Sequence, residues 1–78
     1  MVISYKKLWK LLIDRDMKKK DLLQVSGISQ SSLSKLGRNE NVTIDVLARI
    51  CGALRCDIGS IMEISLSEAD VQTEEKRI

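Results

Sequence analysis

A chain of 78 residues is long enough for one small domain, and its core is expected to be aliphatic because Tyr5 and Trp9 are its only aromatic residues. It contains no histidine, no CxxC pair and no glycine-rich phosphate loop, which argues against a zinc site and against an enzyme. Residues 1–38 carry a net charge of +6 (nine basic, three acidic) and residues 39–78 one of −4 (four basic, eight acidic), which predicts an anionic partner for the N-terminal half.

Two helices are predicted in the basic half of the chain. Ser4 is a suitable N-cap for the first, which apolar residues at a helical spacing extend to about residue 15. Those residues are Tyr5, Leu8, Trp9, Leu12 and Ile13. The second helix is expected over about residues 18–25, with Gly27 ending it in the left-handed conformation.

Three more helices are predicted after Gly27. Ser29 is the expected N-cap of one that ends at Gly37. Thr43 is the expected N-cap of the next, in which Gly52 indicates the close approach of another helix. Asp57 precedes a short apolar segment that is expected to form the fifth helix.

The expected fold class is therefore all-α, a compact five-helix bundle. It is expected to occupy residues 1–64 as one domain. Residues 65–78 are expected to form a short C-terminal tail, and their sequence is compatible with either a last helix or disorder.

Several lysines lie at the N-termini of the predicted helices, where a positive charge is unfavourable. A helix N-terminus is electropositive, yet the first predicted helix opens with Lys6 and Lys7 and the second with Lys18, Lys19 and Lys20. This placement is favourable where a phosphate group docks. The alternative is an ordinary solvated face.

The residues between positions 22 and 36 resemble a helix-turn-helix, because Leu22, Gly27, Ile28, Leu33 and Leu36 fall where that motif needs core and turn residues. With the framing helices and the segment TIDVLARICGALRCDIGSIME, about residues 3–64 resemble the lambda-repressor-like domains of the Xre family. These are the phage Cro and repressor-type regulators, and the likeness is greatest to small stand-alone bacterial ones. The resemblance implies a sequence-specific regulator of transcription that binds double-stranded DNA through a recognition helix at about residues 29–36.

The same resemblance explains the serines, which make up four of the eight residues from 29 to 36 although serine is a middling helix former. A groove about 12 Å wide favours small polar side chains, although a merely solvated face is the alternative. By position in the motif, the expected base contacts are Gln30, Ser31, Ser34 and Lys35. With the lysine cluster included, the expected phosphate contacts are Lys18, Lys19, Lys20, Ser29 and Arg38.

One recognition helix contacts few base pairs, so a homodimer on an inverted-repeat operator is expected, with its interface within residues 58–66. No cofactor or small-molecule ligand is expected. The alternative function is a protein-binding adaptor or antitoxin-like module with the same fold. A membrane-surface peptide formed by YKKLWKLL is a weaker alternative, because Asp14 and Asp16 follow it.

Cys51 and Cys56 are predicted to be small buried residues of a reduced protein. If both lay on one helix, five residues of rise would separate them by about 7.5 Å, too far for an easy disulfide. The sequence shows no signal peptide and no membrane-spanning segment, so a cytoplasmic location is expected.

Overall fold

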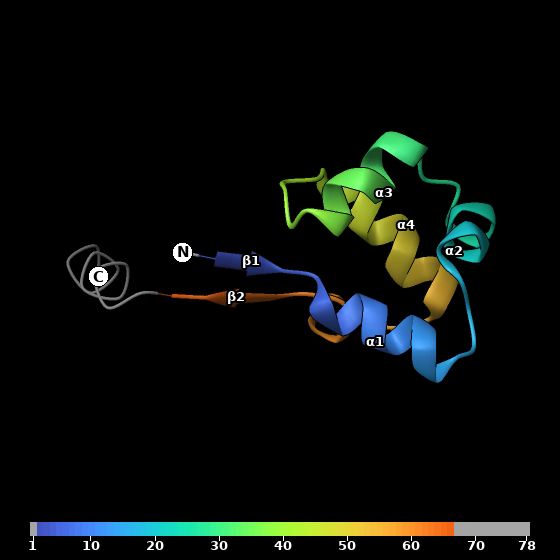
Figure 1. Cartoon of the computed structure of the whole chain (residues 1–78), viewed down its shortest axis with the longest axis horizontal. Coiled ribbons are helices and arrows are strands. Elements are labelled where there is room, and N and C mark those ends of the chain that lie inside the picture. The colour runs from blue at the N-terminus through green and yellow to red at the C-terminus, as the bar shows by residue number, and fades with distance from the viewer. Residues whose placement is uncertain (1, 67–78) are drawn as a thin grey trace.

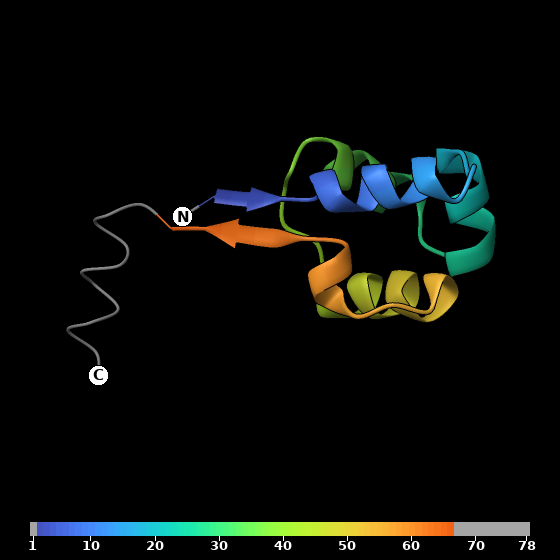
Figure 2. The ribbon, with the colours of Figure 1, turned by 90° about the horizontal axis from the view of Figure 1, so that it is seen from below.

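A short two-stranded ribbon adjoins a body of four α-helices in the computed structural model, which describes residues 2–66 (Figure 1). The elements in chain order are β1 (Val2–Ser4), α1 (Lys6–Asp14), α2 (Lys19–Ser26), α3 (Gln30–Gly37), α4 (Ile44–Leu54), the 3-10 helix η1 (Ile58–Ser60) and β2 (Glu63–Ser65). β1 and β2 pair antiparallel with Ile3 opposite Ile64. Figure 2 shows this ribbon extending away from the helical body.

The core is aliphatic apart from one tyrosine, as the composition predicted. Its buried residues are Tyr5, Leu8, Leu12, Leu22, Ile28, Leu33, Leu36, Leu47, Ile50, Leu54 and Ile61. Every α-helix contributes to this set, so the helical stripes read from the sequence do face the interior. Ile13 is an exception, with 76% of its surface exposed, because it lies about 100° round α1 from the buried Leu12.

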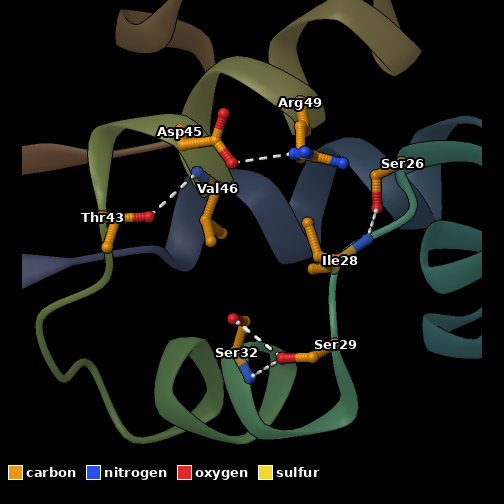
Figure 3. Close-up of polar contacts among 8 residues, drawn as sticks. All are labelled: Ser26, Ile28, Ser29, Ser32, Thr43, Asp45, Val46 and Arg49. Carbon is orange, nitrogen blue, oxygen red and sulfur yellow. Dashed lines mark hydrogen bonds and ion pairs between the residues drawn. The ribbon is translucent and has the colours of Figure 1, made fainter.

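The predicted helix ends are confirmed around α3 and α4. Gly27 follows α2 with a φ of 72°, the left-handed conformation that glycine adopts without strain. The hydroxyl of Ser29 accepts a hydrogen bond from the backbone N–H of Ser32, and that of Thr43 accepts one from Val46 (Figure 3). These two caps fix where the third and fourth helices begin.

The predicted five-helix, all-α architecture differs from the structure at both ends of the described chain. Ser4 lies in β1, and Tyr5 rather than Ser4 occupies the N-cap position of α1. After Asp57 the chain makes only the single 3-10 turn η1 instead of a fifth α-helix, and residue 65 then lies in β2. The two strands were not predicted because three residues are too few to show an alternation of apolar and polar side chains. Their pairing also joins opposite ends of the described chain, and local sequence patterns do not reveal such a contact. The predicted tail from residue 67 onward lies outside the described residues.

The prediction for Gly52 is wrong. A Cβ atom built on this residue would meet nothing within 4 Å, so no neighbouring helix needs the space. Gly52 is an exposed position within α4, where glycine only lowers helix propensity.

Candidate nucleic-acid interface

The turn between α2 and α3 is held by neighbours on two sides. Ile28 lies in the core, and its backbone N–H donates to the hydroxyl of the buried Ser26 over 3.4 Å. On the other side, the Arg49 guanidinium of α4 lies 3.8 Å from the position that a Cβ on Gly27 would take. Asp45 accepts a 2.8 Å hydrogen bond from Arg49 and fixes that guanidinium (Figure 3). The turn therefore contacts the core on one side and a side chain of α4 on the other.

α3 has one buried face and one accessible face. Leu33 and Leu36 are buried against the core. The residues predicted to contact bases lie elsewhere on the helix: Gln30, Ser31 and Lys35 are exposed and Ser34 is half-buried. They fall at positions i, i+1, i+4 and i+5, which places them on one side of an α-helix. The structure thus brings all four together on the accessible face.

The serines of α3 divide into two pairs with different environments. Ser29 caps the helix, and its hydroxyl also donates to the hydroxyl of Ser32 at 3.1 Å (Figure 3). The hydroxyl of Ser29, predicted to contact a phosphate, is therefore already engaged within the protein. Ser31 and Ser34 belong instead to the polar accessible face.

The lysines at the start of α2 are all exposed, but their surroundings differ. The Lys19 ammonium lies 4.8 Å from the centre of the Trp9 ring, a cation–π distance that restrains this side chain. Lys18 donates its backbone N–H to the Asp21 carboxylate at 2.8 Å. Sequence reasoning overlooked Asp21, although the three-residue spacing of a capping pair was available to identify it.

Arg38, another predicted phosphate contact, is paired within the protein. Its guanidinium donates twice to the Glu40 carboxylate, over 2.8 Å from Nε and 3.2 Å from the terminal nitrogen. This hydrogen bonding holds the pKa of Glu40 below its ordinary value and raises that of Arg38. Glu40 was also missed from the sequence. The left-handed turn at Asn39, with a φ of 56°, brings the two side chains together.

The loop after α3 is fastened to the start of α1 through one aromatic side chain. Tyr5 is 2% exposed, and its backbone N–H donates to the Asn39 side chain at 3.1 Å. Its hydroxyl donates to the Glu40 carbonyl at 2.9 Å. Burial raises the pKa of Tyr5 above its ordinary value. The segment that carries Arg38 is thus a fixed part of the fold.

The premise of the cysteine prediction is wrong, and the two cysteines, both free, are half-buried rather than buried. α4 ends at Leu54, and Arg55 takes a left-handed conformation that turns the chain back. The Cys56 N–H then donates to the Cys51 carbonyl at 3.1 Å, which brings the two residues together. Burial raises the pKa of the Cys51 thiol, and the Cys56 thiol and Asp57 raise it further.

Among residues 2–66, no helix has both the length and the apolar character needed to cross a membrane. The same residues contain no cluster of three or more histidine, cysteine, aspartate or glutamate side chains that could hold a metal ion.

A capped helix, a left-handed glycine turn and a second helix with a polar outer face together define a helix-turn-helix domain. Residues 7–67 match the Cro/C1-type HTH (helix-turn-helix) DNA-binding domain, and the chain belongs to this family. A solved structure, the crystal structure of the transcriptional regulator VanUg in Form II, is 55% identical in sequence and superimposes with a TM-score of 0.79. That similarity covers 85% of this chain and 88% of the other. No curated protein matches the chain. The predicted resemblance to Cro and repressor-type regulators is confirmed.

Proposed function

We propose that this protein is a transcriptional regulator that binds double-stranded DNA sequence-specifically with α3 in the major groove. The two-sided character of α3 is the observation that carries the proposal. Leu33 and Leu36 anchor the helix in the core, while its small polar side chains leave it slim enough for a groove about 12 Å wide. The family and the structural relative named as a transcriptional regulator support the same function.

The accessible face of α3 supplies side chains suited to reading base edges. Gln30 can accept from and donate to adenine in a bidentate pair, and Lys35 can donate to the O6 and N7 atoms of guanine. Ser31 and Ser34 can hydrogen-bond to either kind of base because a hydroxyl both donates and accepts.

Basic side chains outside this face supply the contacts to the DNA backbone. Lys18, Lys19 and Lys20 stand where the electropositive end of α2 adds to their charge. Arg38 directly follows α3. Such contacts position the protein on the duplex and make its affinity depend on salt, but they carry no sequence information.

We further propose that the protein binds an inverted-repeat operator as a homodimer. Exposed apolar side chains gather where β2 and η1 meet the start of α4: Ile44 is 73% exposed and Ile64 is 53% exposed. A shallow apolar pocket of about 380 Å³ lies among them. It is lined by Ile44, Leu47, Ile58, Gly59, Met62, Glu63 and Ile64. An isolated two-stranded ribbon is also marginal by itself, so pairing with a second copy would stabilise it.

Substitution of one exposed isoleucine tests this dimer surface. Ile64→Lys places a charge beside the apolar pocket and should give a folded monomer with much weaker binding to a two-fold operator. Ile13→Lys is the matched control, because Ile13 is also exposed but lies on α1 outside the pocket. Analytical ultracentrifugation measures the outcome. A dimer that survives Ile64→Lys places the interface elsewhere.

Selection of binding sites from a random-sequence DNA library tests the function itself. At moderate salt the wild-type protein should enrich one motif, with two half-sites about 10 base pairs apart from centre to centre. Failure to enrich any motif would refute sequence-specific binding and would favour the alternative of a protein-binding adaptor.

A further inference from the structure

The pair between Arg38 and Glu40 lies at the end of α3, beside the proposed base-reading face. Both side chains are exposed, so water and ions reach them freely. The guanidinium and carboxylate nevertheless meet in a two-point geometry, with hydrogen bonds of 2.8 and 3.2 Å. Such bidentate pairs are the most directional that these two groups form. A DNA phosphate offers the same guanidinium a similar arrangement of oxygens.

Backbone contacts, rather than this ion pair, fix the position of Glu40. Its N–H donates to the Lys35 carbonyl at 2.9 Å, and its carbonyl accepts from the Tyr5 hydroxyl. The backbone of Glu40 is therefore held near the C-terminal end of α3 whether or not Arg38 is engaged, and the carboxylate stays within reach of that end. Lys35 is close enough that its charge helps to lower the pKa of Glu40. One acidic group thus faces two of the cations assigned to DNA.

We infer that Glu40 is a positioning residue that competes with DNA phosphates for Arg38 and so limits binding to non-specific sequences. This inference rests on the proposed function, because it assumes that Arg38 lies beside the DNA backbone. In a loosely held, non-specific complex, no phosphate is fixed next to Arg38, and the guanidinium stays on Glu40. In the specific complex, the base contacts of α3 hold a phosphate in register, and the phosphate displaces the carboxylate.

Glu40→Gln isolates this effect because it removes the charge and leaves the shape and backbone contacts of the residue in place. With the competitor weakened, Arg38 becomes available to phosphates at any sequence. One more phosphate contact steepens the plot of log affinity against log salt by about 0.9, or about eightfold in affinity for each tenfold change in salt. Affinity for a random-sequence duplex should therefore rise more than affinity for the selected operator.

The experiment is a double-mutant cycle on the full chain, using wild type, Glu40→Gln, Arg38→Ala and the double variant. Binding to a random-sequence duplex and to the selected operator is measured by fluorescence anisotropy over a range of salt concentrations. Glu40→Gln should steepen the slope on random DNA by about 0.9 and lower the ratio of specific to non-specific affinity. In the Arg38→Ala background the same substitution should change the slope by much less. Circular dichroism confirms that all four proteins are folded.

Three results would overturn the inference. An unchanged slope in Glu40→Gln would show that the carboxylate does not compete for Arg38. Equal changes with and without Arg38 would show that Glu40 acts only through the overall charge. Unaltered affinity of Arg38→Ala for the selected operator would remove Arg38 from the DNA interface, while operator recognition by α3 could still stand. Failure of the wild type to select any operator, by contrast, would overturn the proposed function itself.

Discussion

Tyr5→Phe removes a single hydroxyl and should loosen the connection between α1 and the loop after α3. The ring of Tyr5 is 2% exposed and would remain buried as phenylalanine, so the apolar packing is retained. The substitution removes the 2.9 Å hydrogen bond from the Tyr5 hydroxyl to the Glu40 carbonyl and leaves that carbonyl without this donor. A hydrogen bond of this kind contributes about 0.5–1.5 kcal/mol, and an orphaned acceptor can add to the loss. We therefore expect Tyr5→Phe to lower the free energy of unfolding by about 1–2 kcal/mol.

Alkaline pH gives a second test, of the burial of the Tyr5 hydroxyl rather than of its hydrogen bond. Burial raises the pKa of Tyr5 above the ordinary value of 10.0, so the folded state holds this proton more tightly than the unfolded state. The stability that the protonated Tyr5 hydroxyl contributes is fully present below pH 10.0 and is lost as the pH rises through the folded-state pKa of Tyr5. The difference in stability between wild type and Tyr5→Phe should therefore shrink in that alkaline range.

Urea denaturation followed by circular dichroism at neutral and alkaline pH measures both effects. Because other side chains titrate in both proteins, the comparison is made between them at each pH. For a domain of this size, 1 kcal/mol also corresponds to about 4–8 °C in Tm, which thermal melts resolve easily. Equal stability of the two proteins at neutral pH, or a gap that does not narrow in alkali, would refute this account of Tyr5.

Other substitutions give results of opposite sign or of no effect. Gly27→Ala should destabilise the fold by about 1–2 kcal/mol because its φ of 72° disfavours a side chain. Gly52→Ala should instead stabilise the fold by about 0.5–1 kcal/mol, because alanine has the higher helix propensity. Urea denaturation measures both changes, and a loss of stability at both positions would contradict these assignments. Lys19→Gln should weaken binding to all DNA sequences alike and flatten the salt slope by about 0.9 in anisotropy titrations, and an unchanged slope would remove α2 from the interface. Replacing Cys51 and Cys56 with serine should leave DNA affinity unchanged under oxidising and reducing conditions, whereas redox-dependent binding by the wild type would show that the thiols regulate it.

Local rules were sufficient to predict the part of the fold that carries the interface. Gly27, Ser29 and Thr43 act through contacts within a few residues, so their roles in ending and starting helices are visible in the sequence. The spacing of Leu33 and Leu36 likewise identifies the buried side of α3, and with it the side that stays accessible.

The features that escaped prediction depend on contacts that local patterns do not encode. β1 and β2 pair across the full length of the described chain, and three residues per strand are too few to show alternation. The Arg38–Glu40 pair requires a left-handed residue between its partners, since side chains two positions apart on a helix do not face each other. Asparagine is enriched in that conformation, so Asn39 was the available signal.

The base preference of Gln30→Ala tests the central claim most directly, because Gln30 is exposed on the accessible face of α3. Site selection is carried out in parallel with the wild type, with Lys35→Ala, and with Lys10→Ala as a control for an exposed lysine on α1. Each α3 variant should lose the base preference at the one base pair per half-site that its side chain contacts. The expected loss of discrimination between the preferred base and the others is about 1–3 kcal/mol. Lys10→Ala should select the wild-type motif. Recovery of an identical motif by both α3 variants would show that this helix does not read the DNA sequence.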